Sequence, residues 1–299
     1  MAPVVLLAGG TGGAKLARGL LDELGDELVV IANTGDDIEI YGAHVSPDPD
    51  LVTFWLADAI DARGWGLAGD TFAAMDQLRA LGEDIWFNLG DRDLAIGLHR
   101  AQRLAAGGRL TGAVDDLRRA FGVRASILVP SDDPVRTWVR SGGQWRPFQE
   151  FMIRTGGAGP VQDVAFRPFG GAAPAPEALA ALGEAQAVVI GPSNPVLSID
   201  PILWVLRDAV RDAPAPVVAV SPLVRGEVLK GPTAACLEWA QRTQDSDGIA
   251  AHYGGLIDGL VADQRADGVP TLETDVELGD PAARRRVARA VLDFAAALT

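Results

Sequence analysis

The stretch VVLLAGGTGGAKL occupies residues 4–16 and joins an apolar run to a loop that contains four glycines. Residues 4–8 are typical of a buried strand, and residues 16–24 place leucines on one helical face. Glycines between a strand and a helix let the backbone approach an anion and point amide groups at it. The stretch therefore predicts a strand, an anion-binding loop and a helix, which is the start of a Rossmann-like fold.

Other apolar runs predict the remaining strands of a sheet. The runs at residues 187–190 and 217–220 are continuous and rich in β-branched side chains, which is typical of parallel strands covered on both faces. Runs at residues 28–32, 125–129 and 259–262 are consistent with further strands, and strands joined through a helix lie parallel. We expect an α/β protein with a Rossmann-like, mostly parallel sheet and helices on both faces.

The rest of the sequence fits additions to one unit that spans residues 1–299. Residues 54–121 are predicted to form a mainly helical insertion, which follows a helix start near Val52. Residues 137–185 contain a small β-hairpin and a connection rich in Gly, Ala and Pro, and residues 233–299 form a less well defined C-terminal part. The elements expected here are strands at 137–139 and 144–151 and helices near 176–182, 201–209 and 281–298.

Composition excludes several classes of function. The chain carries 26 Lys and Arg against 40 Asp and Glu, a formal net charge of −14, so it repels nucleic acid and general binding of nucleic acid is excluded. The single cysteine, Cys236, cannot form an intrachain disulfide, which indicates a reducing compartment. No segment approaches about 18 uninterrupted apolar residues, and no basic flank marks a signal peptide. We expect a cytoplasmic protein without a membrane partner.

The glycine loop fits neither familiar phosphate-binding template. The dinucleotide fingerprint would require glycine at Lys15, and the P-loop would require Gly-Lys-Ser/Thr at residues 14–16. An NAD-dependent oxidoreductase and a P-loop ATPase are therefore both disfavoured. A phosphate is the expected guest, with Lys15 adding charge near it. The alternative is a tight strand-to-helix turn without a ligand.

Paired aspartates follow the second predicted strand and recur in later loops. In NTGDD, residues 33–37, adjacent carboxylates beside a phosphate crevice favour Mg²⁺, although a turn held by Asx hydrogen bonds fits this segment equally well. In SPDPD, residues 46–50, one aspartate fits a helix N-cap, and capping does not account for the other aspartate. In NLGDRD, residues 88–93, a structural role fits the isolated hexapeptide best.

The loop GPSNP, residues 191–195, follows a predicted buried strand. Its two prolines fix a loop that presents Ser193 and Asn194 as hydrogen-bonding groups for a ribose, a phosphate or a base. Pro195 replaces the last glycine of G-x-S-x-G, which disfavours a serine hydrolase. The three histidines are scattered, so a histidine zinc site or a catalytic triad has little support; they are His44, His99 and His252.

Six segments in order resemble the 2-phospho-L-lactate transferase family, whose enzymes act in the biosynthesis of the deazaflavin coenzyme F-420. They are GGTGGAKL at 9–16, NTGDD at 33–37, SPDPDLVT at 46–53, LGDRD at 89–93, SDDP at 131–134 and GPSNP at 191–195. The resemblance runs from residue 4 to about 232 and is weak beyond 233. It departs at residues 49–53, where the family commonly reads Leu-Asp-Thr: Asp50 keeps its place, and the threonine is displaced.

The resemblance implies a transfer onto 7,8-didemethyl-8-hydroxy-5-deazariboflavin, called Fo. The terminal ribityl hydroxyl of Fo attacks the phosphorus of a guanosine diphosphate derivative that carries a lactyl, enolpyruvyl or glyceryl group, and GMP leaves. It also implies Mg²⁺ as cofactor and a homodimer. Phosphoryl transfer depends mainly on positioning and charge neutralisation, which this histidine-poor sequence can supply.

The predicted site follows from the loops and from this resemblance. Asp50 and Asp37 are the predicted catalytic residues, and Asp36, Asp37 and Asp50 are the predicted Mg²⁺ ligands. The predicted deazaflavin contacts are Asp50, Asn88 and Asp91. The predicted nucleotide and phosphate contacts are Gly10, Thr11, Gly12, Gly13, Lys15, Asn33, Ser193 and Asn194.

A second class of protein shares part of this pattern. Nucleotide-sugar-binding regulators of the related gluconeogenesis-factor family have a glycine-rich start and an acidic loop, and they act by binding rather than by turnover. Their acidic loop usually reads Asp-Asp-Gly-Gly, whereas Ile38 follows Asp37 here. The segments at 46–50 and 89–93 also favour the transferase.

Overall fold

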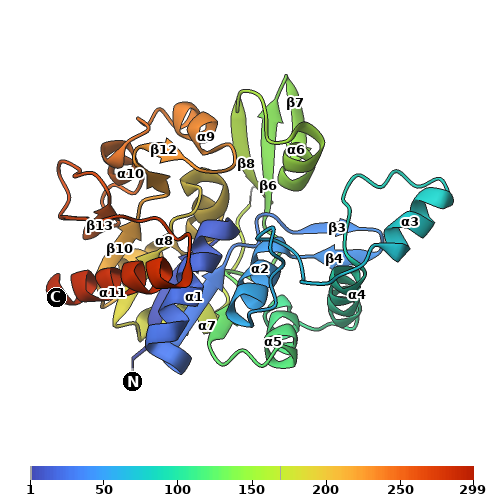
Figure 1. Cartoon of the computed structure of the whole chain (residues 1–299), viewed down its shortest axis with the longest axis horizontal. Helices are drawn as coiled ribbons and strands as arrows, with labels where there is room; N and C mark the ends of the chain where they lie inside the picture. Colours follow the sequence, from blue (N-terminus) through green and yellow to red (C-terminus); the bar gives the residue numbers. More distant parts are fainter. Residues whose placement is uncertain (1, 169) are drawn as a thin grey trace.

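Seven parallel strands form the central sheet of the computed structural model, which describes residues 2–168 and 170–299 (Figure 1). The strand order is β14-β13-β10-β9-β1-β2-β5, so β1 lies between β9 and β2. The predicted parallel sheet is confirmed, and β14 extends it by one strand that the sequence pattern did not predict. The strands are β1 Val4–Ala8, β2 Leu28–Ala32, β5 Ser126–Leu128, β9 Ala187–Ile190, β10 Val217–Val220, β13 Gly259–Ala262 and β14 Thr271–Glu273.

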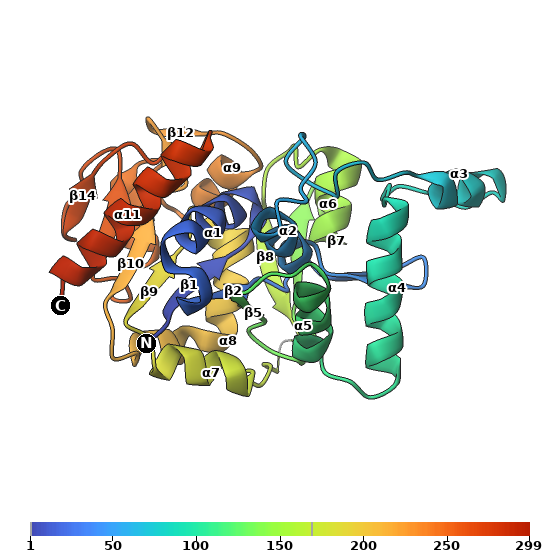
Figure 2. The same ribbon diagram turned by 60° about the horizontal axis from the view of Figure 1, so that its bottom comes forward.

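Helices cover both faces of this sheet because alternate strand residues point to opposite sides. Leu6 of β1 packs in one core with Leu20 of helix α1 and Val287 of helix α11. Leu7 packs in a second core with Leu203 of helix α8. Figure 2 shows α1 and α11 on one side of the sheet and α7 and α8 on the other. The helices are α1 Gly10–Leu24, α7 Pro176–Gly183, α8 Asp200–Arg211, α10 Ser246–His252 and α11 Pro281–Ala297.

The insertion after β2 extends away from the sheet (Figure 1). It holds a hairpin and four helices, which are β3 Ile38–Ile40, β4 Ala43–Val45, α2 Pro47–Leu56, α3 Ala73–Ala80, α4 Asp91–Ala105 and α5 Leu110–Ala120. Helix α2 begins at Pro47 rather than near Val52, because proline suits the first helical turn and carboxylates there favour the helix dipole. Asp48 and Asp50 therefore lie on the first turn of α2 rather than in a loop before it.

The predicted hairpin is confirmed, with two corrections. Its second strand ends at Pro147, where helix α6 begins, and residues 163–167 of the predicted connection form a third strand. The pattern DVAFR at these residues is half-buried on both faces, so it gave no clear alternation. These elements are β6 Arg136–Ser141, β7 Gln144–Pro147, α6 Phe148–Thr155 and β8 Asp163–Arg167.

The loops that follow β1, β2, β9 and β10 all start from the same edge of the sheet, because these strands are parallel. Beyond β10 the chain forms a short hairpin and a helix that lie above this edge (Figure 1). They are β11 Leu223–Val224, β12 Glu227–Val228 and α9 Thr233–Trp239. Within residues 2–168 and 170–299, no helix has the length and apolar character needed to cross a membrane.

Candidate active site

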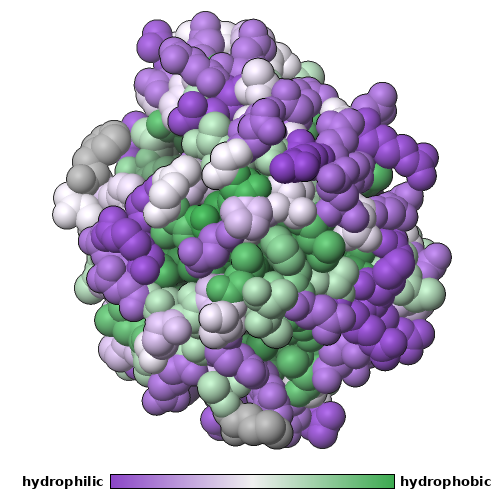
Figure 3. Space-filling view, turned by 90° about the vertical axis from the view of Figure 1, so that its left-hand side faces the viewer, coloured by the Kyte–Doolittle hydropathy of each residue, from purple (hydrophilic) through white to green (hydrophobic). Residues whose placement is uncertain are grey.

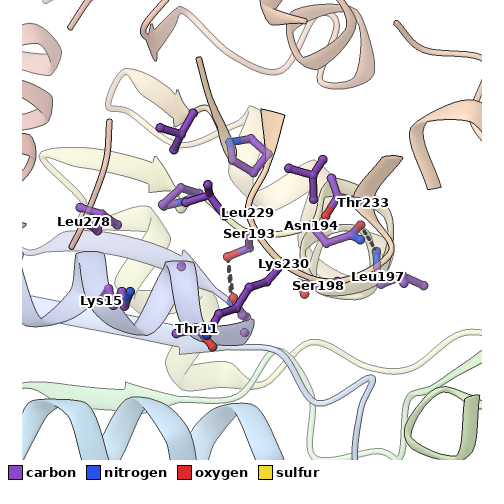
Figure 4. Close-up of a pocket in the computed structure, with 18 of the residues that line it drawn as sticks. Thr11, Lys15, Ser193, Asn194, Leu197, Ser198, Leu229, Lys230, Thr233 and Leu278 are labelled. Carbon is purple, nitrogen blue, oxygen red and sulfur yellow. Dashed lines mark hydrogen bonds between the residues drawn. The ribbon is translucent and has the colours of Figure 1, made fainter. Parts of the chain in front are cut away.

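The predicted glycine loop, residues 9–13, is Gly9 and the first turn of α1 rather than a loop before the helix, because α1 begins at Gly10. We keep the name glycine loop for these residues, which pack directly against the loop after β9 (Figure 4). The Ser193 hydroxyl donates a hydrogen bond to the Gly9 carbonyl at 2.6 Å and accepts one from the Gly9 amide at 3.3 Å. A Cβ atom at Gly12 would lie 2.0 Å from the Pro192 carbonyl oxygen, so a larger residue requires that backbone to move. The glycines therefore serve the contact between these two segments.

A cavity of about 360 Å³ opens beside this contact, between the glycine loop and the segment after β10. The structure brings six of the predicted nucleotide contacts to its lining: Gly10, Thr11, Gly12, Lys15, Ser193 and Asn194. Gly13 is buried, and a Cβ there would lie 2.9 Å from the Ala8 side chain, so Gly13 serves packing against β1. Asn194 also holds the loop, because its Oδ1 accepts the amides of Val196 and Leu197 at 3.0 Å.

A second group of side chains, the acidic cluster, consists of Asp36, Asp37, Asp48 and Asp50, all buried. Asn33 joins two of them, because its Nδ2 donates to Asp36 at 3.0 Å and to Asp48 at 2.9 Å. Asp48 also accepts the Gly10 amide at 2.7 Å, which ties the cluster to the glycine loop. The predicted nucleotide contact Asn33 is thus fully buried inside the acidic cluster rather than placed in the cavity lining.

Asp37 and Asp50 have partners from the insertion. The Asp37 carboxylate accepts the Ser46 hydroxyl at 2.7 Å, and its other oxygen lies 3.0 Å from His44 Nε2. Asp50 is ion-paired with Arg100 of α4, a guanidinium that is only 1% exposed. Arg100 also donates to the His44 carbonyl at 2.8 Å, so α4 holds the hairpin and the first turn of α2 together.

The acidic cluster carries more negative charge than its surroundings neutralise. Burial raises the pKa of Asp36 well above its ordinary value, and the charges of Asp48 and Asp37 raise it further. Burial also raises the pKa of Asp48 to about 6, although hydrogen bonds from Asn33 and Gly10 oppose this change. Burial raises the pKa of Asp50 as well, against the charge of Arg100. A proton or a cation bound here would relieve this cost.

Stability should therefore depend on pH through Asp48. Its pKa is 3.8 ordinarily and about 6 in the folded protein, so folding favours the protonated form. The protonated Asp48 contributes fully to the free energy of unfolding below pH 3.8, and this contribution is lost as the pH rises through 6. The free energy of unfolding changes by about 3 kcal/mol over this range. Thermal unfolding is measured in EDTA for the wild type and for Asp48→Asn. As the pH rises from 4 to 7, the midpoint temperature of the wild type should fall relative to that of Asp48→Asn.

Asp208→Asn is the matched control, because this side chain is 85% exposed on α8 and should leave the wild-type profile unchanged. Parallel profiles for the wild type and Asp48→Asn would contradict the assignment.

The predicted deazaflavin contacts lie in different places. Asp91 starts α4 and caps the start of α3, since its carboxylate accepts the Ala73 and Ala74 amides at 3.1 and 2.9 Å. Asn88 is exposed and accepts a hydrogen bond from Arg79 at 2.5 Å. Both side chains thus make their hydrogen bonds to α3, whereas Asp50 belongs to the acidic cluster and is paired with Arg100 of α4.

Carboxylate oxygens are the ligands that Mg²⁺ prefers, which makes the acidic cluster the place to test for a metal. Among residues 2–168 and 170–299, no three Asp, Glu, His or Cys side chains are arranged to hold a metal ion. The predicted ligands Asp36, Asp37 and Asp50 therefore do not form a ready three-ligand set. Asn33 brings a carboxylate oxygen of Asp36 and one of Asp48 to the same amide group, so these two side chains are the pair that a divalent cation could bridge.

Sequence reasoning missed two side chains near this edge of the sheet, Arg100 and Trp65, whereas it placed residues 230–232 beside the same crevice. Arg100 lies in an ordinary amphipathic helix, and only the fold brings it to Asp50. Trp65 and Lys230 come from separate segments, and the Lys230 ammonium lies 5.5 Å from the centroid of the Trp65 ring.

The fold and the cavity define an α/β protein of the Rossmann-like class with a cavity at the carboxyl edge of its sheet. The family model of the 2-phospho-L-lactate transferase CofD matches residues 4–285. The chain belongs to this family, and it is a transferase of coenzyme F-420 biosynthesis. The family predicted from six motifs is confirmed, and the match continues beyond residue 233, where the motifs gave little support.

Relatives agree with this assignment along nearly the whole chain. A phosphoenolpyruvate transferase of Kitasatospora aureofaciens is 39% identical and covers 96% of this chain and 97% of its own length. A 2-phospho-L-lactate transferase of Methanospirillum hungatei is 36% identical, with 97% and 99% covered. The solved structure of protein BH3568 from Bacillus halodurans, 19% identical, has a TM-score of 0.60 over 98% of this chain and 100% of that chain, which shows a shared fold.

Proposed function

We propose that the protein transfers a phospholactyl, phosphoenolpyruvyl or phosphoglyceryl group from a guanosine diphosphate derivative to the ribityl hydroxyl of Fo, with release of GMP. One observation carries this proposal: the glycine loop that lines a cavity of about 360 Å³ is hydrogen-bonded through its Gly10 amide to Asp48 of a buried acidic cluster. Family membership supports the transfer, and the names of the relatives supply two of the three donor groups.

The cavity is the proposed site of the donor. The amides of the glycine loop and the N-terminus of α1 favour a diphosphate, and Lys15 adds a positive charge beside them. Asp48 already accepts the Gly10 amide, so the amides that follow it are the ones left for phosphate oxygens. Asn194 and the apolar wall around Leu197 and Val224 would hold the nucleoside part.

The acidic cluster is the proposed site of the chemistry. Attack by the ribityl oxygen forms a new bond to phosphorus, breaks the bond between that phosphorus and the oxygen of GMP, and releases the hydroxyl proton. A carboxylate of the cluster accepts this proton, and Asp50 and Asp37 are the proposed catalytic residues. Asp50, Asn88 and Asp91 are the proposed contacts of Fo.

Magnesium belongs to the same proposal. Burial raises the pKa of these carboxylates because their charged forms are costly there, and a bound divalent cation would lower this cost. Asp36 and Asp48 would hold it, with Asp37 and Asp50 close by. When bound, it would neutralise charge on the phosphate oxygens of the donor.

We also propose that the enzyme is a cytoplasmic homodimer. One face has an apolar centre that is surrounded by hydrophilic residues (Figure 3), and this arrangement supports a surface for self-association.

The deciding experiment incubates the purified protein with Fo, Mg²⁺ and freshly generated donors that carry the enolpyruvyl, lactyl or glyceryl group. Chromatography should show GMP and a phosphorylated deazaflavin in equal amounts with at least one donor. Absence of GMP with every donor, together with tight binding of a nucleotide sugar, would move the assignment to the regulator class.

Removal of divalent cations should lower the turnover rate about a hundredfold or more, because the loss of charge neutralisation at phosphorus costs several kcal/mol. The measurement follows GMP release after treatment with EDTA and after Mg²⁺ is added back. Full activity in EDTA would contradict the metal assignment and leave the transfer itself intact.

A further inference from the structure

The two lysines of the sequence are placed together. The chain has 24 arginines and two lysines, Lys15 and Lys230, and both line the cavity described above. Lys15 lies on α1, and Lys230 lies in the loop between β12 and α9. Two segments that are more than two hundred positions apart thus bring every lysine ammonium of the protein to one pocket. Every other basic Lys or Arg position of the sequence is an arginine.

Both ammonium groups are held without a carboxylate partner. Among residues 2–168 and 170–299, no Asp or Glu forms an ion pair with either lysine. The Lys230 ammonium lies 5.5 Å from the centroid of the Trp65 ring, and the Lys15 ammonium lies 6.0 Å from that of Trp55. A cation over an aromatic face is retained by a weak attraction, about 0.5–1 kcal/mol at exposed sites. Both charges are therefore available to an anion.

The charges around the cavity favour such an anion. Burial lowers the pKa of Lys15, and the charges of Lys230 and Arg284 lower it further, against Glu277. The two lysines repel each other across the cavity, and a bound anion would convert this repulsion into attraction. In Figure 4 the Lys230 side chain extends from its loop toward the glycine loop at Thr11. The loop amides and both lysines thus border the same space.

We propose that Lys230 is a positioning residue that, together with Lys15, binds the diphosphate of the donor from the side opposite the glycine loop. The inference rests on the proposed function for the identity of the donor. Lysine suits this role because a compact charge on a flexible stem can leave the Trp65 ring and follow a phosphate oxygen. Arg225, on the neighbouring hairpin turn, does not line the cavity and is not part of this device.

Binding and kinetics give the first test. Lys230→Met should raise the Kd for GDP and the KM for the donor about tenfold or more, with a smaller change in kcat, because a charge-assisted contact to the ground-state diphosphate is lost. Lys230→Arg should recover most of the affinity. Arg225→Met removes one positive charge from the neighbouring hairpin turn and should behave as the wild type. Equal GDP affinity in the wild type and Lys230→Met would overturn the proposal.

Spectroscopy gives a test that does not need turnover. Reductive methylation with ¹³C-formaldehyde keeps the lysine charge and labels only Lys15, Lys230 and the terminal amine. The Lys15 and Lys230 signals, assigned with Lys230→Met, should shift when inorganic pyrophosphate or GDP is added, while the terminal signal stays in place. Lysine signals whose chemical shifts do not change with either anion would overturn the proposal.

The two hypotheses fail in different ways. Shifts with pyrophosphate but none with GDP, in a protein that releases no GMP, would support the lysine pair and reject the guanosine donor. GMP release by the wild type with an unchanged KM in Lys230→Met would support the proposed function and reject the role of Lys230.

Discussion

Asp50→Asn should lower the turnover number by about two to four orders of magnitude, the range for loss of a positioned proton acceptor. Asparagine keeps the shape of the side chain and an oxygen that can accept from Arg100, so the ion pair becomes a hydrogen bond and the fold survives. Steady-state release of GMP at saturating Mg²⁺ is the measurement, and circular dichroism with thermal unfolding reports the fold.

Asp208→Asn serves again as the control, because it removes one carboxylate from the exposed surface of α8. Turnover within about threefold of the wild type in Asp50→Asn would remove this residue from the catalytic group, since even modest acid–base catalysis contributes about a hundredfold.

Gly12→Ala should destabilise the protein and remove donor binding together. The added methyl group would lie 2.0 Å from the carbonyl oxygen and 3.1 Å from the carbonyl carbon of Pro192, which are backbone atoms that do not rotate away. The loop after β9 must move, and overpacking of this kind costs about 1–3 kcal/mol. Urea unfolding should measure this loss of unfolding free energy, and calorimetry with GDP should show the loss of affinity.

Gly112→Ala is a close control, because Gly112 also lies inside a helix and has no atom within 4 Å of an added Cβ. That substitution should leave GDP binding unchanged and raise stability by about 0.5–1 kcal/mol through helix propensity. A Gly12→Ala protein that is as stable as the wild type would show that the two loops are not locked together.

The central sheet could be predicted because each of its inner strands shows its environment locally. The runs at β1, β9 and β10 are continuous and β-branched, and strands covered by helices on both faces need this composition. Strand β8 escaped prediction because its residues are half-buried throughout. The start of α2 was misplaced because prolines at residues 47 and 49 resemble a loop, although the first turn of a helix tolerates them.

The site was predictable in its parts and not in its connections. The glycine loop, the paired aspartates and the GPSNP loop were each visible as motifs, and parallel strands place their ends together. The hydrogen bonds of Asn33 to Asp36 and Asp48 were not visible, because an asparagine after a strand gives no sign of which carboxylates it will bridge. The pairing of Asp50 with Arg100 spans 50 positions and depends on how α4 packs.

The hydrogen bond from the Gly10 amide to Asp48 links the lining of the cavity to the acidic cluster. A ligand that binds Asp48 within the acidic cluster changes the hydrogen bond that this carboxylate accepts from Gly10, the first amide of α1 beside the cavity. Thermodynamic reciprocity then requires each ligand to change the affinity for the other by the same factor. Binding at the acidic cluster would thus change the affinity for a ligand in the cavity, and the reverse, without any movement of domains. The two substrates would therefore not bind independently.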